Sequence, residues 1–387
     1  DVARANKLIC NIDLVTDNSL TTAERAQYKA EAKIFRAMVM FDMVRLWGDF
    51  PVITTVADDI TSENIDEVYP QYFPKQNTEL EAYQQIEKDL LDAVLYAPDN
   101  TPGNKTLFSK SVARTLLAKI YAEKPLRDYT KVIQYCDEVK ADGFDLVDDF
   151  SDLFGMNAAG TDAKMRNTKE SILEAQFTSG AGNWCTWMFG RDLVNWNNNF
   201  TWAKWVTPSR DLISAFKQEG DEVRFKESIV YYDCNWSNYY SSDNYPFMYK
   251  CRSANSSIIK YRYADVLLLK AEALIMQDTP DLEGAADIID EVRDRAKLGA
   301  LPTSVRSNKN VLLNALLKER RLELAFEGQR WFDLVRLDKV EEVMNAVYSK
   351  DSGRKAQIYT FDKNSYRLPI PQSVIDANDK IHQNPGY

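Results

Sequence analysis

The side chains that most often perform acid–base or metal chemistry are scarce in this sequence. The chain has a single histidine, His382, close to its C-terminal end. Histidine is the commonest metal ligand and the commonest acid–base group near neutral pH. We therefore expect neither a zinc site built from histidines nor a Ser-His-Asp triad.

Carboxylates are abundant, and they leave one enzymatic alternative open. Glycoside hydrolysis needs two carboxyl groups at a defined separation across a cleft. Asp192 and Asp233 lie near a cluster of aromatic residues, but neither sits in a recognisable catalytic motif. The sequence also has no GxSxG motif, P-loop or dinucleotide fingerprint. We expect a binding protein without catalytic residues, with a glycoside hydrolase on a helical scaffold as the less favoured alternative.

Aromatic residues are the group whose placement points to a ligand. Six of the eight Trp lie between residues 184 and 236, among many Tyr, Asn and Asp. Ligand sites combine apolar walls with a few placed polar groups, and loops on a rigid scaffold often carry them. A flat ring can stack on the C–H face of a sugar while amides and charged groups bind its hydroxyls. The candidate ligand-binding residues are Trp184, Trp187, Trp196, Trp202, Trp205, Trp236, Tyr239, Tyr240, Arg191 and Asn195.

The same rings also suit a purely structural role. A loop-rich segment needs large side chains to build a core, and Trp and Phe bury the most area each. We expect most of the six Trp to be core and a minority to touch ligand. The net charge of -10 argues against a nucleic-acid partner, because phosphate binding depends on clustered Lys and Arg.

A charged run at 319–336, ERRLELAFEGQRWFDLVR, could be mistaken for an active site. Its acids and bases recur at helical spacing, so we expect i, i+3 and i, i+4 ion pairs that lock two helices together. No cofactor is expected; Asp-rich loops such as 148–152 allow structural calcium, although the sequence has no EF-hand spacing.

The five cysteines have no metal-binding spacing. An odd number leaves at least one thiol free. Buried free thiols are the favoured interpretation, with a Cys234–Cys251 bridge as the alternative.

Helices dominate both ends of the chain. The first helix begins at residue 2, and a long one follows a Thr21 or Thr22 N-cap with Glu24 in its first turn, ending at Gly48. Its apolar residues cover most of its circumference, so we expect burial on several sides and pairing of Asp42 with Arg45. Further helices are expected at 78–96, 110–123 and 129–140, then over 258–296 and 315–337.

Two of these segments resemble tetratricopeptide repeats. Residues 112–139 form two amphipathic helices around a tight turn, and 258–296 repeat that plan. Between them, residues 144–257 are loop-rich, with β-like runs at 171–177 and 229–232 and one short helix at 209–219. The fold class expected is mostly α: a tetratricopeptide-like scaffold at 1–143 and 258–387 with an inserted aromatic-rich variable region at 144–257, together one compact unit.

Several segments together resemble the SusD/RagB-type outer-membrane nutrient-binding lipoproteins. They are AEAKIFRAMVMFDMVRLWGDFPVIT at 30–54, SVARTLLAKIYAE at 111–123, KYRYADVLLLKAEAL at 260–274, ERRLELAFEGQRWFDLVRL at 319–337 and LPIPQSVIDANDKIHQNPGY at 368–387. Their order and spacing span the whole chain.

The resemblance implies four tetratricopeptide-like helix pairs and a variable region that supplies the ligand site. It implies a cell-surface lipoprotein of the outer membrane that captures oligosaccharides for a SusC-like TonB-dependent transporter. Lipid anchoring would come from an upstream segment, since Cys10 lies inside a helix and no signal peptide precedes it. The matching motifs are scaffold, so no site residue carries over. Some members of the family bind peptides, which leaves a peptide ligand as an alternative, and a helical-repeat adaptor for protein partners is a third.

Overall fold

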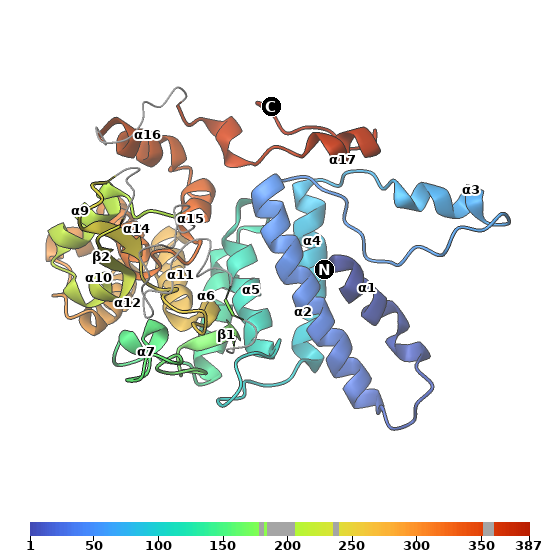
Figure 1. Ribbon diagram of the computed structural model, residues 1–387, viewed down its shortest axis with the longest axis horizontal. Helices are drawn as coiled ribbons and strands as arrows, with labels where there is room; N and C mark the ends of the chain where they lie inside the picture. Colours follow the sequence, from blue (N-terminus) through green and yellow to red (C-terminus); the bar gives the residue numbers. More distant parts are fainter. Residues whose placement is uncertain (178–181, 184–205, 235–239, 351–359) are drawn as a thin grey trace. The chain divides into compact units, whose positions relative to one another are not determined.

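Two compact units make up the computed structural model, which describes residues 1–177, 182–183, 206–234, 240–350 and 360–387 (Figure 1). Unit 1 contains residues 1–100, 107–135 and 361–387, so that the C-terminal tail joins the N-terminal helices. Unit 2 contains residues 101–106 and 136–360. The prediction of a mostly helical fold is confirmed.

Unit 1 is built from helices that pack side by side. Its main elements are α1 (Val2–Asn11), α2 (Thr22–Trp47), α3 (Ile65–Val68), α4 (Glu79–Tyr96), α5 (Lys110–Ala122), the start of α6 (Tyr129–Ala141) and α17 (Gln372–Ala377), with 3-10 turns η1 (Ile12–Leu14), η2 (Tyr69–Tyr72), η3 (Lys124–Leu126) and η4 (Lys363–Tyr366). Helix α2 packs against α1 and α4, and α4 packs against α5 (Figure 1).

The start of α2 shows why helix starts in unit 1 could be predicted from the sequence. Thr21 accepts a hydrogen bond from the Glu24 amide, and the Glu24 side chain accepts one from the Thr21 amide. This capping box satisfies two amide groups that a helix start leaves without partners. Thr78 and Glu81 repeat the arrangement at the start of α4. As predicted, α2 is buried on several sides, and Arg45 donates to Asp42 at 2.6 Å.

The C-terminal tail completes the other end of α2. Gly48 ends the helix with a φ of 72°, a conformation that favours glycine. The Leu368 amide donates to the Leu46 carbonyl oxygen at 2.7 Å, and Asn384 Nδ2 donates to the Trp47 oxygen at 2.9 Å. Carbonyls that the helix end leaves unpaired are thereby satisfied by the tail. The tail itself contains the short helical segments η4 and α17.

Unit 2 combines helical hairpins with two short sheets. Its elements, with the rest of α6, are α7 (Ser151–Phe154), β1 (Ser171–Ala175), α9 (Arg210–Glu219), α10 (Glu222–Ser228), β2 (Ile229–Tyr232), β3 (Tyr245–Met248), β4 (Ile258–Arg262), α11 (Tyr263–Met276), α12 (Leu282–Arg295), α13 (Thr303–Arg306), α14 (Lys309–Glu323), α15 (Arg330–Arg336) and α16 (Val340–Lys350). Helix α11 packs against α12 and α14. The sheets pair β1 with β4 and β2 with β3, both antiparallel.

Three details of unit 2 differ from expectation. Residues 258–262, predicted to begin a helix, form strand β4, because they pair with Ser171–Ala175. Alternation of Ile259 and Tyr261 inward gives the period of a strand. The region 144–257 also holds α7 and α10 besides the predicted helix. Cys234 and Cys251 are not joined by a disulfide, so the predicted alternative of a bridge between them is wrong.

The charged run at 319–336 is structural, as predicted, but its partners are mostly distant in sequence. Arg320 pairs with Asp333 at 2.8 Å and with Asp265 at 2.7 Å. Glu323 is fully buried and pairs with Arg224, Arg262 and Arg295. Only the Asp333–Arg336 pair has the expected i, i+3 spacing. The network therefore joins α10, β4 and α12 to α14 rather than closing on itself.

Candidate functional site

Most of the predicted ligand-binding residues lie outside the described residues. These are Trp184, Trp187, Trp196, Trp202, Trp205, Trp236, Tyr239, Arg191 and Asn195, and the catalytic candidate Asp192 lies there too. The remaining predicted residue, Tyr240, is described. It lines an open hollow of about 630 Å³ in unit 2. We call this the tyrosine hollow; its lining residues are Arg210, Ile213, Ser214, Lys217, Gln218, Tyr231, Tyr240 and Asn244.

Helix α9 forms one wall of the tyrosine hollow. Its five lining residues, Arg210, Ile213, Ser214, Lys217 and Gln218, follow the i, i+3, i+4, i+7, i+8 spacing of a single helix face. The adjoining face of α9 buries Leu212 and Phe216 against Ile229 and Leu322. The helix is therefore held by the core of unit 2, which fixes the backbone that carries its polar side chains.

The N-cap of α9 gives a direct test of how firmly this wall is held. Ser209 Oγ accepts a hydrogen bond from the Leu212 amide at 3.1 Å. Ser209→Ala is expected to lower the free energy of unfolding by about 1 kcal/mol, because that amide loses its partner. Ser209→Asp, which keeps an acceptor, should retain wild-type stability in urea denaturation. Equal stability of both variants and wild type would show that the cap contributes nothing.

Tyr240 forms the second wall, and its ring is fixed on three sides. Its hydroxyl donates to the Pro208 carbonyl oxygen at 2.7 Å. Its ring meets Tyr245 edge-on at 5.6 Å between centroids. The Arg210 guanidinium lies over the ring, 4.4 Å from the centroid. A cation at this distance from an aromatic face is attracted by the ring quadrupole. Tyr240 thus also orients Arg210.

Tyr231 supplies the other aromatic surface. Strand β2 alternates, so Ile229 and Tyr231 face the α9 cluster while Val230 and Tyr232 face the cluster of Tyr245 and Phe247. The Tyr231 side chain is half-buried, and burial raises the pKa of its hydroxyl above the ordinary value. A tyrosine hydroxyl is neutral at physiological pH even at its ordinary pKa of about 10, so it can donate a hydrogen bond here. Tyr231 is the residue of the hollow best suited to stack on a sugar.

Asn244 brings an amide to the rim of the hollow. Its φ is 60°, and its backbone amide donates to Asp233 Oδ1 at 2.8 Å. Asn tolerates this left-handed conformation better than most residues. Asp233, a catalytic candidate from the sequence, is therefore engaged in holding the turn. Among the described residues that line the hollow there is no carboxylate.

Asn244→Gly separates the role of the amide from the role of the turn. Glycine adopts a positive φ without strain, so the fold should be unchanged. Loss of one hydrogen-bonding side chain should weaken ligand binding about five-fold, corresponding to ~1 kcal/mol. Titration of both proteins with the same glycan checks this, and unchanged affinity would place Asn244 outside the site.

Arg210, Ser214, Lys217, Gln218 and Tyr231 were not among the predicted site residues. The sequence did carry a signal for the first four, because a helix was predicted at 209–219 and these residues share one of its faces. Tyr231 stood in the aromatic cluster, but nothing local distinguishes it from Tyr232. Which tyrosine faces α9 depends on strand register, and register is set by pairing with β3.

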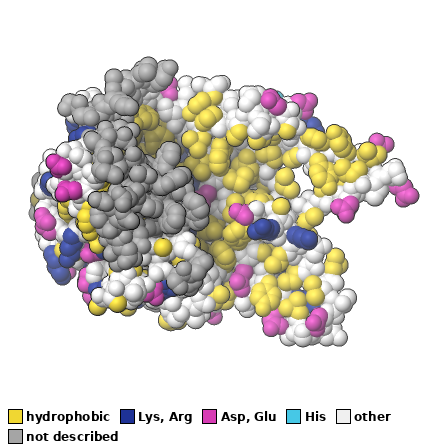
Figure 2. Space-filling view, viewed as in Figure 1, with side chains coloured by type: hydrophobic (Ala, Val, Ile, Leu, Met, Phe, Trp, Pro, Cys, Tyr) yellow, Lys and Arg dark blue, Asp and Glu magenta, His cyan; other side chains and the backbone are white. Residues whose placement is uncertain are grey.

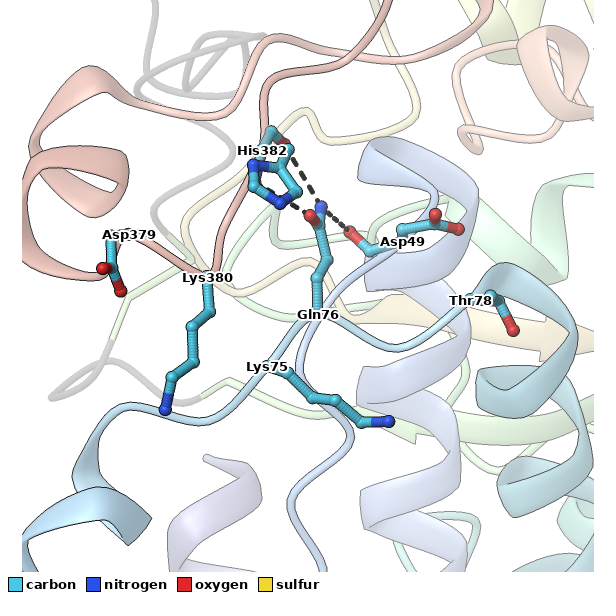
Figure 3. Close-up of a pocket in the computed structure, with 7 residues that line it drawn as sticks. All are labelled: Asp49, Lys75, Gln76, Thr78, Asp379, Lys380 and His382. Carbon is cyan, nitrogen blue, oxygen red and sulfur yellow. Dashed lines mark hydrogen bonds between the residues drawn. The ribbon is translucent and has the colours of Figure 1, made fainter.

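Unit 1 carries two further hollows that adjoin each other. A groove of about 580 Å³ has almost entirely apolar walls, which include Trp47, Phe50, Phe73 and Val374. A polar hollow of about 500 Å³ shares Asp49 and Gln76 with that groove. In Figure 3 the Gln76 amide donates to the backbone oxygens of Asp49 and His382, and the side chains of Lys75 and Lys380 point away from each other. The lining of the polar hollow contains no Trp, Tyr or Phe, which makes it a poorer sugar site than the tyrosine hollow.

The acidic loop at 148–152 is the part of the chain for which the sequence suggested a metal ion. The carboxylates of the acidic loop at 148–152 form ion pairs with lysines: Asp148 pairs with Lys169, and Asp149 and Asp152 pair with Lys164. No group of three or more metal-ligating side chains occurs among the residues that the structure describes. In the same residues, every helix is too short or too polar to cross a bilayer.

Comparison with known proteins gives matches at both ends of the chain. The model of the SusD family matches residues 241–387. A SusD-like model described as starch-binding and associating with the outer membrane matches residues 1–122. Between them the two matches include the segments that carry the resemblance seen in the sequence, except for the last residue of 111–123.

Individual relatives match over nearly the whole chain. A SusD-like protein of Formosa agariphila, P2, is 28% identical, over 100% of this chain and 78% of its own length. The starch-binding protein SusD of Bacteroides thetaiotaomicron is 24% identical, over 97% of this chain and 76% of its own length.

Solved structures share the fold. A laminarin-binding SusD-like protein has a TM-score of 0.74 at 24% identity, and a SusD homologue of Bacteroides thetaiotaomicron has 0.77 at 22%; each alignment covers 100% of this chain and 84% of the other. The solved structures show a shared fold, and the two family models together with the relatives show that the chain is SusD-like.

Proposed function

We propose that this protein is a non-catalytic glycan-binding protein of the cell surface, which captures oligosaccharides for a SusC-like TonB-dependent outer-membrane transporter. The tyrosine hollow is the observation that carries the proposal. It combines two aromatic side chains, Tyr231 and Tyr240, with amide, hydroxyl and cationic groups on a helix face. Relatives named for binding starch and laminarin support a glycan as the ligand.

The composition of the hollow also favours binding over hydrolysis. Glycoside hydrolases flank the scissile bond with two carboxyl groups about 5–10 Å apart. The described lining offers two cations, two tyrosines and uncharged polar groups instead. Such a lining can hold a sugar but has no group to protonate its leaving oxygen in the usual way.

Unit 1 supports the second half of the proposal, a protein partner at the outer membrane. Of the large hydrophobic side chains that are exposed among the described residues, all but Met165 and Val311 belong to unit 1. Figure 2 shows hydrophobic side chains gathered on the face presented by α17 and the end of α2. An extended exposed apolar surface typically marks contact with another polypeptide. The description of the matching family associates its members with the outer membrane. A transporter of that membrane is therefore a suitable partner for the apolar surface of unit 1.

Affinity electrophoresis in polysaccharide gels tests the proposal. We expect retardation in a gel that contains the cognate glycan, with starch and laminarin as the first probes, and no release of reducing ends on prolonged incubation. Release that a carboxylate substitution abolishes would show a hydrolase. Retardation by no glycan, together with heat evolved on titration with peptides, would favour the peptide-binding alternative.

A further inference from the structure

We propose that the apolar groove of unit 1 receives a segment of a partner polypeptide in which apolar side chains are flanked by lysine or arginine. This inference rests on the partner half of the proposed function and states the chemistry of the partner's contacting segment. Two features of unit 1 carry it. One is the groove itself, and the other is a neighbouring arm of the chain, residues 56–72, which has acidic but no basic side chains.

The apolar groove has a buried floor and an exposed rim. Phe50 and Ile381 are buried among its lining residues, whereas the side chains of Tyr72 and Val374 are exposed to solvent. Anchor side chains of protein partners are mostly large and apolar, and they fill pockets of this kind. The groove is therefore shaped to receive an aliphatic or aromatic side chain.

Hydrogen bonds join two walls of the groove. Asn378 Nδ2, just after α17, donates to the Pro74 carbonyl oxygen at 2.8 Å. Lys380 Nζ donates to the Phe73 carbonyl oxygen at 3.0 Å. The C-terminal tail and the segment at 73–74 are thus held together in the absence of a ligand. A surface that is already ordered loses less conformational entropy when a partner binds.

The chain leaves the groove at Pro51 and returns to it at Tyr72. In between it forms an arm that includes α3 and stands away from α2 and α4 (Figure 1). We call residues 56–72 the acidic arm, because they include five carboxylates but no lysine or arginine. All five are exposed, and none forms an ion pair with a residue that the structure describes. They are Asp58, Asp59, Glu63, Asp66 and Glu67.

The acidic arm has its own internal structure. The Tyr72 hydroxyl donates to the Asp58 carbonyl oxygen at 3.1 Å, and Asn64 Nδ2 donates to the Asp59 carbonyl oxygen at 3.0 Å. Figure 2 shows hydrophobic side chains along the arm and acidic ones at its far end. The exposed apolar residues are Val56, Ile60, Ile65, Tyr69 and Tyr72. The arm thus extends the apolar surface of the groove and adds negative charge to it.

Charge complementarity identifies what flanks the partner's apolar side chains. Unpaired carboxylates attract cationic segments and repel acidic ones, which favours lysine and arginine. The nearest cations that line a hollow, Lys75 and Lys380, belong to the polar hollow, whose lining also includes Asp49 and Asp379. They therefore do not offset the arm. A second copy of this chain is a poor occupant, because both copies would carry a net charge of -10.

Three synthetic peptides test the groove and the arm separately. The first has leucine and tryptophan anchors flanked by lysine and arginine. The second has the same anchors flanked by glutamate, and the third keeps the basic flanks but has serine in place of the anchors. We expect only the first to bind in calorimetric titration, with an affinity that falls as salt is added, because exposed charges are screened.

Substitution of a rim residue assigns the binding to the groove. Val374→Gln should weaken binding of the first peptide about ten-fold, because an interface contact with an anchor side chain is lost. The side chain is on the surface, so the fold should be retained. Val311→Gln is the matched control, since Val311 is a helical valine of unit 2 with 43% exposure against 45% for Val374. It should leave binding unchanged.

Neutralising two carboxylates assigns the charge preference to the arm. Asp58→Asn combined with Asp59→Asn should weaken binding of the first peptide about five-fold at low salt, as expected for two exposed charge pairs, and less at high salt. Asp278→Asn combined with Asp294→Asn removes two exposed carboxylates of unit 2 and should have no effect.

Four results would overturn the proposal. They are equal affinity for the first two peptides, binding of none of the three, equal weakening by Val374→Gln and Val311→Gln, and equal weakening by the two double variants. Sedimentation of the protein alone is the companion measurement. A dimer that Val374→Gln dissociates would make a second copy the occupant and would also contradict the proposal. Each of these results leaves glycan binding standing, whereas retardation by no polysaccharide contradicts the proposed function and leaves the peptide result intact.

Discussion

Replacement of Glu323 by glutamine is expected to lower the free energy of unfolding by about 3–5 kcal/mol, the range for breaking a buried ion pair. Glu323 is completely buried and lies within 3.0 Å of Arg224 and 2.5 Å of Arg262, with Arg295 as a third partner. The neutral amide would leave three buried guanidinium groups short of one negative charge. Urea denaturation at neutral pH measures the loss.

The neighbouring carboxylate of Glu319 offers a second substitution whose cost in stability can be compared with that of Glu323→Gln. Burial raises the pKa of Glu319 above its ordinary value, and Arg224 and Arg293 only partly oppose this effect. For Glu323 burial acts in the same direction, but Arg295, Arg262 and Arg224 outweigh it and hold its pKa well below the ordinary value. Glu319→Gln should therefore cost less than Glu323→Gln. Glu342→Gln, at an exposed pair with Lys339, should change stability little.

The lowered pKa of Glu323 determines how its contribution to the stability of the protein changes with pH. A carboxyl group whose pKa is lowered by folding stabilises the protein at pH values above its unfolded pKa, which is about 4.3 for Glu. That contribution is lost as the pH falls through the folded pKa. The stability difference between wild type and Glu323→Gln should accordingly shrink below about pH 4. A difference independent of pH, or a larger cost for Glu319→Gln, would contradict the roles assigned to the two residues.

Tyr231→Ala is expected to weaken glycan binding about thirty-fold, which corresponds to ~2 kcal/mol and is typical of truncating a central aromatic contact. The ring is half-buried against the α9 cluster and presents its remaining surface to the hollow. Tyr231→Phe keeps the ring face and removes the hydroxyl, so it should lose only a hydrogen bond, about five-fold. Calorimetric titration of the three proteins with one glycan provides the comparison.

A stability measurement must accompany this titration. Tyr231→Ala removes packing against Phe225, whose ring centroid lies 6.4 Å from that of Tyr231, so some loss of stability is expected. Binding measured far below the midpoint of unfolding separates the two effects. Wild-type affinity in a folded Tyr231→Ala protein would exclude stacking on this ring.

Local signals predicted the helices because their ends are determined locally. The capping box of Thr21 and Glu24 and the positive φ of Gly48 involve neighbours in sequence, so residue types alone indicate them. Strand β4 was missed for the opposite reason. Its apolar run IIKYR suits a helix or a strand, and pairing with β1, some ninety residues earlier, decides between them.

The charged run illustrates the same limit. The sequence indicated that its residues are paired and structural, and this is confirmed. The partners of Glu323 on α10, β4 and α12 could not be read from spacing, because no local pattern relates residues 28 to 99 positions apart.

The candidate site was only partly accessible from the sequence. The aromatic region was identified and Tyr240 was named, but the hollow is completed by the polar face of α9. The sequence of α9, taken alone, suits a purely structural helix equally well. Only the packing of α9 against β2 shows that its Arg210–Gln218 face and the two tyrosines border the same space.

A crystal structure of the protein with an oligosaccharide of a retarding glycan would test the central claim most directly. We predict a sugar ring stacked on Tyr231 in the tyrosine hollow, with its polar groups within hydrogen-bonding distance of Arg210, Lys217 or Asn244. An oligosaccharide bound away from the hollow, for instance in the apolar groove of unit 1, would contradict the account.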